Sequence, residues 1–156
     1  MRDRIAASIL LLVIVACNST DHASRVAAYV PRSRAITVTT VPLLVKEAQS
    51  VYPFLKPAFA RGGVLESKEV YAFSPSTITV VEGDTIHFTF INPEDDVHSF
   101  VLPDFVVSLP GGKTTEATYV AKHAGIFSIV CAVQSHLPMM SGQLVVLPAQ
   151  TMAGAR

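Results

Sequence analysis

Between residues 77 and 90 apolar side chains alternate with polar ones, and this alternation constrains the fold more than any other feature of the chain. Ile86, Phe88 and Phe90 alternate with threonine and histidine, and the sequence Thr-Ile-Thr-Val at 77–80 has the same pattern. A period of two residues is typical of a β-strand with one buried face. The pattern therefore predicts two consecutive half-buried strands.

Similar patterns extend over the C-terminal half of the chain. Four more segments are rich in β-branched and aromatic residues, with turns that contain glycine or proline between them. Several short strands at this spacing indicate an all-β sandwich with one core. The four segments are 97–102, 114–120, 126–133 and 143–147.

The first residues have the composition of an export signal. A charged start is followed by an apolar run, Ile5 to Ala16, and then by Cys17. The run is shorter than the roughly 20 residues that a membrane span needs. We expect 1–16 to be a signal peptide and Cys17 to be lipidated, because residues 14–17 (Ile-Val-Ala-Cys) resemble a lipobox. The alternative is an ordinary signal peptide in which Cys17 has no role.

The rest of the chain divides by composition. Residues 17–63 are expected to form an irregular, lipid-anchored tether, residues 64–148 the β-domain and residues 149–156 a C-terminal tail. Within the tether, the pattern suggests a strand at 37–41 and a short helix within 43–54. The two parts also differ in charge: residues 18–65 carry six Lys or Arg and two acids, and residues 66–148 carry three Lys and nine acids.

Three residues with metal-binding side chains fall close together near the C-terminal end: Cys131, His136 and Met140. His98 lies upstream, on a different predicted strand. A thiolate, two imidazoles and a weak thioether are the donors of a trigonal copper site. Each residue taken alone is more often a core residue or a solvated one, but the four donors in this order predict one bound copper. Met139 is the alternative axial ligand.

The cysteines and the alternation support this interpretation. Cys17 and Cys131 are the only cysteines of the chain, and their separate roles exclude a disulfide between them. Phe127, Ile129 and Cys131 fall on one face of the predicted strand 126–133. We therefore expect the thiol to point inward at the end of a packed strand, with copper at the rim of the core.

With these residues, the chain resembles the cupredoxins, the blue copper proteins, over about residues 66–148. The spacing from Cys131 through His136 and Met140 to Gly142 is similar to the ligand loop of azurin. The segment 98–103 looks more like the copper domain of cytochrome oxidase subunit II, which holds two coppers with two cysteines. Ser135 stands where the second cysteine would be. The resemblance thus implies a Greek-key β-sandwich with one mononuclear type 1 copper.

The resemblance also implies electron transfer without substrate chemistry, with His136 as the exit for the electron from an apolar rim. Ser99 is expected to donate a hydrogen bond to the Cys131 sulfur and so to raise the reduction potential. Three other histidines are expected to be solvated and not to bind metal: His22, His87 and His123.

The expected partner is a redox protein such as a c-type cytochrome or a copper oxidase. The acidic run 94–96 would steer a basic partner, although a solvated loop is an equally good interpretation. We expect the protein to be exported to a periplasmic or otherwise extracytoplasmic location and to be attached to a membrane through the lipid anchor. No nucleic acid and no small-molecule substrate are expected.

Other functions use the same residues. A copper oxidase or nitrite reductase would need a second copper site, usually connected through histidines beside the cysteine, whereas Val130 and Ala132 flank Cys131. We therefore expect a protein that is not an enzyme. A copper chaperone, a storage protein or an assembly factor for an oxidase remains the alternative, which the spectrum and the potential of the bound metal would distinguish.

Overall fold

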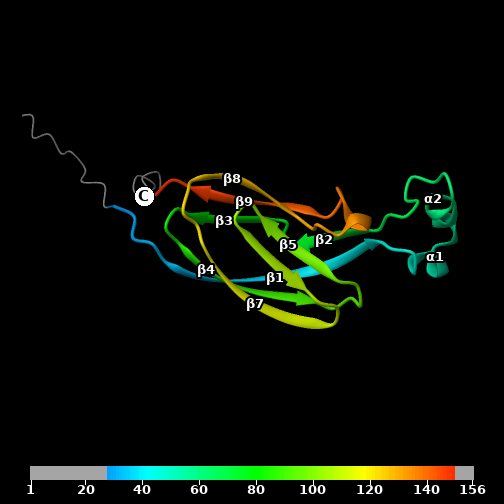
Figure 1. Cartoon of the computed structure of the whole chain (residues 1–156), viewed down its shortest axis with the longest axis horizontal. Coiled ribbons are helices and arrows are strands. Elements are labelled where there is room, and N and C mark those ends of the chain that lie inside the picture. Colours follow the sequence, from blue (N-terminus) through cyan, green and yellow to red (C-terminus); the bar gives the residue numbers. More distant parts are fainter. Residues whose placement is uncertain (1–27, 150–156) are drawn as a thin grey trace, which may run out of the picture.

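A computed structural model describes residues 28–149, which form two packed β-sheets (Figure 1). The result confirms the β-sandwich expected from the alternation. Cys17 and His22 lie outside the described residues. The strands are β1 (Ser33–Leu44), β2 (Val70–Ser74), β3 (Thr77–Val81), β4 (Thr85–Asn92), β5 (His98–Leu102), β6 (Phe105–Leu109), β7 (Lys113–Val120), β8 (Gly125–Val130) and β9 (Ser141–Leu147).

The two sheets have different strand orders. One has four strands in the order β2-β1-β4-β7, and the other has five in the order β3-β9-β8-β5-β6. Strand β1 runs parallel to β4, and β3 runs parallel to β9, while the other neighbours are antiparallel. The alternation in β4 places Ile86, Phe88 and Phe90 in the core and leaves His87 exposed, as predicted.

Strand β1 corrects the predicted boundary between tether and domain. The expected tether, 17–63, contains this strand, which is longer than the suggested 37–41 and lies between β2 and β4. Val38 and Thr40 are buried in the sandwich. The charged and polar residues at the start of β1 concealed its full length, because only part of the strand shows a clear alternation. The sandwich therefore begins well before residue 64.

Aromatic side chains fill the space between the sheets. Phe73, Phe88, Phe90 and Phe100 are almost completely buried, and the rings of Phe90 and Phe100 have centroids 4.8 Å apart. Rings that pack in tilted or edge-to-face pairs stabilise a core beyond the burial of their area alone. This packed layer supports β5 and the end of β8, from which two of the predicted ligands project.

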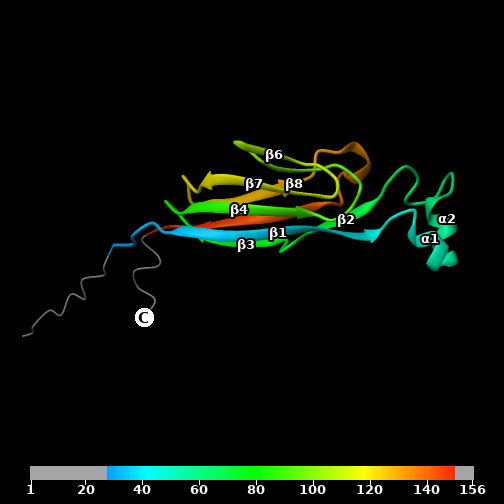
Figure 2. The same cartoon turned by 90° about the horizontal axis from the view of Figure 1, so that it is seen from below.

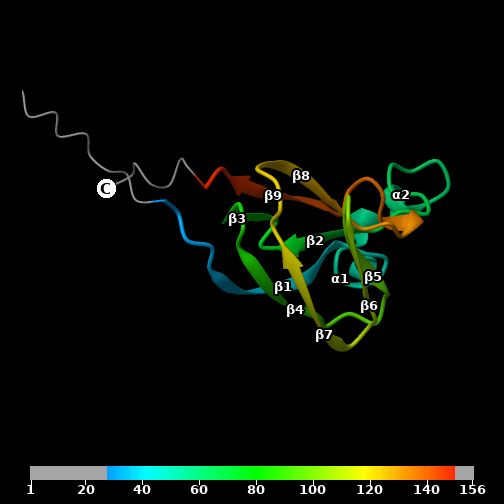
Figure 3. The same ribbon diagram turned by 60° about the vertical axis from the view of Figure 1, so that its left-hand side comes forward.

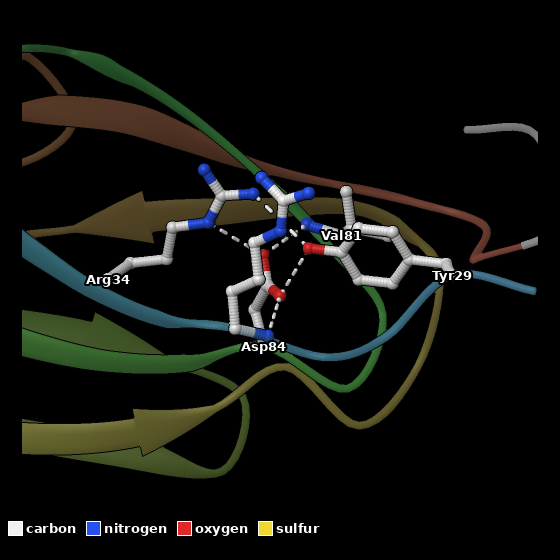
Figure 4. A network of polar contacts seen from close by, with 5 residues as sticks. Tyr29, Arg34, Val81 and Asp84 are labelled. Atoms are coloured by element: carbon white, nitrogen blue, oxygen red, sulfur yellow. Dashed lines mark hydrogen bonds and ion pairs between the residues drawn. The ribbon is translucent and has the colours of Figure 1, made fainter. Parts of the chain in front are cut away.

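Asp84 organises the end of the sandwich where β1 begins (Figure 4). Its carboxylate accepts hydrogen bonds from the Tyr29 hydroxyl at 2.6 Å, the Arg32 backbone N–H at 2.8 Å and the Arg34 Nε at 2.9 Å. The Val81 N–H donates to the same side chain at 3.2 Å. Asp84 thereby attaches the segment before β1 to the turn between β3 and β4.

The connection between β1 and β2 projects beyond the opposite end of the strands (Figure 2). It contains α1 (Ala48–Val51), η1 (Pro53–Leu55) and α2 (Lys56–Phe59), in place of the one helix expected within 43–54. Figure 3 shows this connection at the same end of the molecule as the loop between β8 and β9. None of the helices within residues 28–149 is long and apolar enough to cross a membrane.

Candidate copper site

Two strands of the five-stranded sheet position the first two predicted ligands. His98 is the first residue of β5, and Cys131 directly follows β8; both are fully buried. Val101 of β5 pairs with Val130 of β8, which brings the two strand ends together. Ile129 is buried on the face of β8 that Cys131 continues, so the thiol points inward as the alternation predicted.

His136 completes a compact group with these two residues. Its Nδ1 lies 3.2 Å from His98 Nδ1 and 3.6 Å from the Cys131 Sγ. One donor atom from each of the three residues lies within 4.8 Å of the other two. The fold thus gathers a thiol and two imidazoles from separate parts of the sequence, with their donor atoms converging.

The loop that carries His136 folds back on itself. The Met140 N–H donates to the His136 carbonyl at 3.0 Å, and the Cys131 N–H donates to the Met140 carbonyl at 3.0 Å. Met140 is fully buried, whereas Met139 is 38% exposed. These bonds connect His136, Met140 and Cys131 in one tight loop, and burial favours Met140 over Met139 as the fourth donor.

Gly142 ends this loop for a steric reason. A Cβ at this position would collide with the backbone carbonyl of Ser76, which accepts a hydrogen bond from the Gln143 N–H at 2.7 Å. Only glycine leaves room for that approach. The glycine in the sequence Met-Ser-Gly therefore lets β9 dock beside β3 directly after Met140.

Ser99 contacts the thiol as predicted. Its backbone N–H lies 3.4 Å from the Cys131 Sγ, and its hydroxyl oxygen lies 3.9 Å from the same sulfur. The hydroxyl also accepts a hydrogen bond from the Ala132 N–H at 2.8 Å. Ser99 therefore joins the start of β5 to the residues after β8 and contacts the sulfur through both its N–H and its hydroxyl.

Asn92 is a buried residue of the site that the sequence analysis missed. Its side-chain amide donates to the Asp96 carbonyl at 2.7 Å and to the Leu109 carbonyl at 3.0 Å. Its side-chain oxygen accepts from the Thr40 hydroxyl at 2.8 Å. Asn92 thus fixes the turn that leads to His98. The only sequence signal is a polar residue at an inward position of β4.

Tyr71 of β2 is the second residue that the sequence analysis missed. Its ring centroid is 4.5 Å from that of His98 and 4.6 Å from that of His136. Both histidines are therefore covered on one side by an aromatic ring. His136, predicted to lie in an apolar rim, is only 2% exposed, although its neighbour Met139 is on the surface.

The burial of the imidazoles keeps them neutral. Burial and, to a smaller extent, the neighbouring His136 lower the pKa of His98 to about 4, against the opposing effect of Asp96. Burial also lowers the pKa of His136, while Asp96 and Glu69 oppose this effect. Metal ligation needs the neutral imidazole, so the site favours the protonation state that binds a metal.

The residues present fit copper. Cys131 offers a soft thiolate, His98 and His136 offer imidazole nitrogens that already converge, and Met140 is the buried thioether of the loop. This combination of donors is the one that type 1 copper prefers. His98 Nε2, by contrast, is buried and has no hydrogen-bond partner among the described residues. His98 faces His136 through Nδ1, which lies 3.2 Å from His136 Nδ1.

The remaining described histidines lie away from this site. His87 is exposed on β4, where its Nδ1 lies 3.2 Å from the Thr118 hydroxyl of the neighbouring strand. His123 is exposed in the turn before β8. Both positions agree with the prediction of solvated side chains.

Solved structures share the fold. A copper-containing nitrite reductase from Thermus scotoductus is 20% identical, with a TM-score of 0.52, over 74% of this chain and 28% of that chain. A copper nitrite reductase from Nitrosomonas europaea is 20% identical, with a TM-score of 0.51, over 80% of this chain and 45% of that chain. Auracyanin A, a blue copper protein from Chloroflexus aurantiacus, is 20% identical, with a TM-score of 0.48, over 73% of this chain and 98% of that chain.

The chain thus spans less than half the length of the two reductases, and the likeness to them shows a shared fold. No curated protein sequence matches the chain. Residues 61–146 match the family described as the cupredoxin-like domain. This match and the His-Cys-His group together identify copper as the metal of the site. The chain therefore belongs to the cupredoxin-like family.

Proposed function

We propose that the protein carries electrons through one type 1 copper held by His98, Cys131 and His136, with Met140 as the weak fourth donor. When bound, copper would supply a one-electron couple between Cu(II) and Cu(I). The observation that carries the proposal is the convergence of one sulfur and two imidazole nitrogens, all buried, from two strand ends and one loop.

The way in which the residues are held supports a carrier. His98 begins a strand, Cys131 ends one, and the loop between Cys131 and Met140 is closed by backbone hydrogen bonds. Such attachments restrain the side chains before metal arrives. A site whose geometry changes little between oxidation states has a small reorganisation cost, which favours rapid electron transfer.

Burial favours an electron carrier over a copper chaperone or storage protein. His98 and Cys131 are fully buried, and His136 is nearly so. A protein that passes copper to an acceptor has to expose its ligands to that acceptor, whereas an electron can cross a layer of covering side chains. Ser99 supports the same function, because hydrogen bonds to the thiolate stabilise the reduced site.

The protein is also proposed to be exported and attached to a membrane through lipidated Cys17, in agreement with a family whose domains are usually exported. Replacement of Cys17 by alanine should abolish acyl labelling and block the lipid-dependent cleavage of the signal peptide. Cleavage to a soluble wild-type product without acyl label would instead show an ordinary signal peptide.

The proposed partner is a basic redox protein such as a c-type cytochrome, steered by Glu94 and Asp95. The third acid of this run, Asp96, accepts a hydrogen bond from Tyr71, so it should be left intact in a test of steering. Glu94→Gln with Asp95→Asn should slow association with a basic cytochrome at low salt, and the difference should vanish near 1 M salt, where the Debye length is about 3 Å. Glu116→Gln, an exposed change on β7, is the control.

The function itself is tested by two rates measured on the copper-loaded full-length chain. Electron transfer to an oxidised c-type cytochrome should be fast, while transfer of copper to a metal-free acceptor protein should be slow. Rapid copper delivery without electron transfer would replace the proposal with the chaperone. Sustained reduction of nitrite or oxygen by the isolated chain would show an enzyme.

A further inference from the structure

Tyr71 touches both imidazoles of the site, although it belongs to neither of the segments that carry them. It lies in β2 of the four-stranded sheet, and its ring meets His98 at an interplanar angle of 67° and His136 at 54°. The tyrosine is only 2% exposed. It therefore bridges the two sheets at the point where the imidazoles meet.

The hydroxyl of Tyr71 is attached to the turn that presents His98. It donates a hydrogen bond of 2.5 Å to the Asp96 carboxylate. Burial raises the pKa of Tyr71, and the bond to Asp96 raises it further, so the phenol remains a donor. The carbonyl of Asp96 is in turn held by Asn92. The ring is thus fixed relative to the backbone immediately before His98.

The residues before Tyr71 are attached to the loop that presents His136. The Glu69 N–H donates to the Ser135 carbonyl at 3.0 Å, and the Lys68 ammonium donates to the Gln134 carbonyl at 3.1 Å. The segment 68–71 therefore makes hydrogen bonds to both ligand-bearing segments and places an aromatic ring between them.

We propose that Tyr71 is a positioning residue of the copper site, which sets the orientation of both imidazoles and shields them from water. The proposal rests on the proposed copper site and adds a residue outside its ligands. The ring supplies the packing contact, and the bond to Asp96 prevents the ring from swinging away. Groups that orient metal-bound histidines typically contribute about 10- to 100-fold in metal affinity.

Three variants of the full-length chain test the proposal. Tyr71→Leu removes the ring, Tyr71→Phe removes only the hydroxyl, and Tyr119→Leu is the control. Tyr119 is also a buried tyrosine beside an aspartate, Asp104. Unlike Tyr71, it lies on β7 opposite Ile86 of β4, which comes six positions before Asn92. The free energy of unfolding of each metal-free protein is measured first. Cu(I) affinity by chelator competition and the Cu(II) hyperfine splitting follow.

Tyr71→Leu should weaken Cu(I) binding by about 10- to 100-fold and change the hyperfine splitting, because the imidazoles are free to rotate. Tyr71→Phe should change the splitting less, and Tyr119→Leu should leave both readouts at the wild-type values. Wild-type affinity and splitting in Tyr71→Leu would overturn the proposal. If Tyr71→Leu does not fold, Tyr71→Phe decides: an altered splitting supports the proposal and an unaltered one overturns it.

The two proposals fail in different ways. A wild-type protein that binds Cu(II) without the strong absorption of a copper thiolate would refute the proposed function. A blue wild-type protein with an equally blue, equally tight Tyr71→Leu variant would refute only the role of Tyr71.

Discussion

The side-chain amide of Asn92 donates a hydrogen bond of 2.7 Å to the backbone carbonyl of Asp96, two residues before the proposed ligand His98. Asn92 is buried at the end of β4 and also contacts β1 through Thr40. A residue that is not a ligand thus ties the turn before His98 to two strands of the opposite sheet.

Asn92→Ala should therefore destabilise the fold. It leaves the Asp96 carbonyl, the Leu109 carbonyl and the Thr40 hydroxyl without their partner, and the expected loss is about 3 kcal/mol of unfolding free energy. Thr40→Val removes only one of these bonds and should cost about 1 kcal/mol. Urea unfolding of the metal-free proteins checks both values, and equal losses would contradict the role assigned to Asn92.

The domain boundary can be tested with fragments. A fragment that begins at residue 64 lacks β1 and leaves β2 and β4 without their common neighbour, whereas one that begins at residue 28 retains every strand of the four-stranded sheet. We expect the longer fragment to unfold cooperatively and the shorter one to show no cooperative transition by circular dichroism. A folded fragment 64–156 would show that β1 is dispensable.

Asp84 should make stability depend on acid pH. Burial alone would raise its pKa, but the hydrogen bonds from Tyr29, Arg32, Val81 and Arg34 outweigh burial, and the pKa is lowered in the folded protein. The carboxylate then stabilises the fold fully above its ordinary pKa of about 4, and this contribution disappears as the pH falls through the lower folded value.

The measurement compares the wild type with Asp84→Asn by urea unfolding as the pH is lowered. Removal of one partner from a buried charged network should cost roughly 3 kcal/mol at neutral pH. The difference between the two proteins should shrink below about pH 4. Because the histidines titrate in both proteins, their contribution cancels in this difference, and a gap that stays constant would contradict the lowered pKa.

Replacements of the two methionines should have different effects on the reduction potential of the bound copper. Met140→Leu removes the proposed weak donor to Cu(II), so it should raise the reduction potential while the protein stays blue. Met139→Leu changes an exposed side chain and should leave the potential unaltered. Redox titration checks both variants, and a larger shift in Met139→Leu would exchange their roles.

Much of the fold and of the site follows from local sequence patterns. Alternation predicts β4 and β7 to within a few residues, and the spacing of Cys131, His136 and Met140 indicates a metal site. A single apolar face is a local property, which is why it can be read from sequence.

Contacts between distant segments could not be read in this way. Strand β1 was predicted only in part, as 37–41, and its place in the sandwich was not predicted because its neighbours β2 and β4 both lie more than 25 residues later in sequence. Tyr71 and Asn92 look like ordinary strand residues. Their roles depend on side-chain partners that only the packing of the two sheets brings close.

The spectrum of the full-length chain loaded with Cu(II) tests the copper site most directly. A thiolate, two imidazoles and a weak axial thioether should give an intense charge-transfer band in the red and a narrow hyperfine splitting, and Cys131→Ser should abolish the colour. A colourless wild-type protein with a tetragonal copper spectrum would contradict the account.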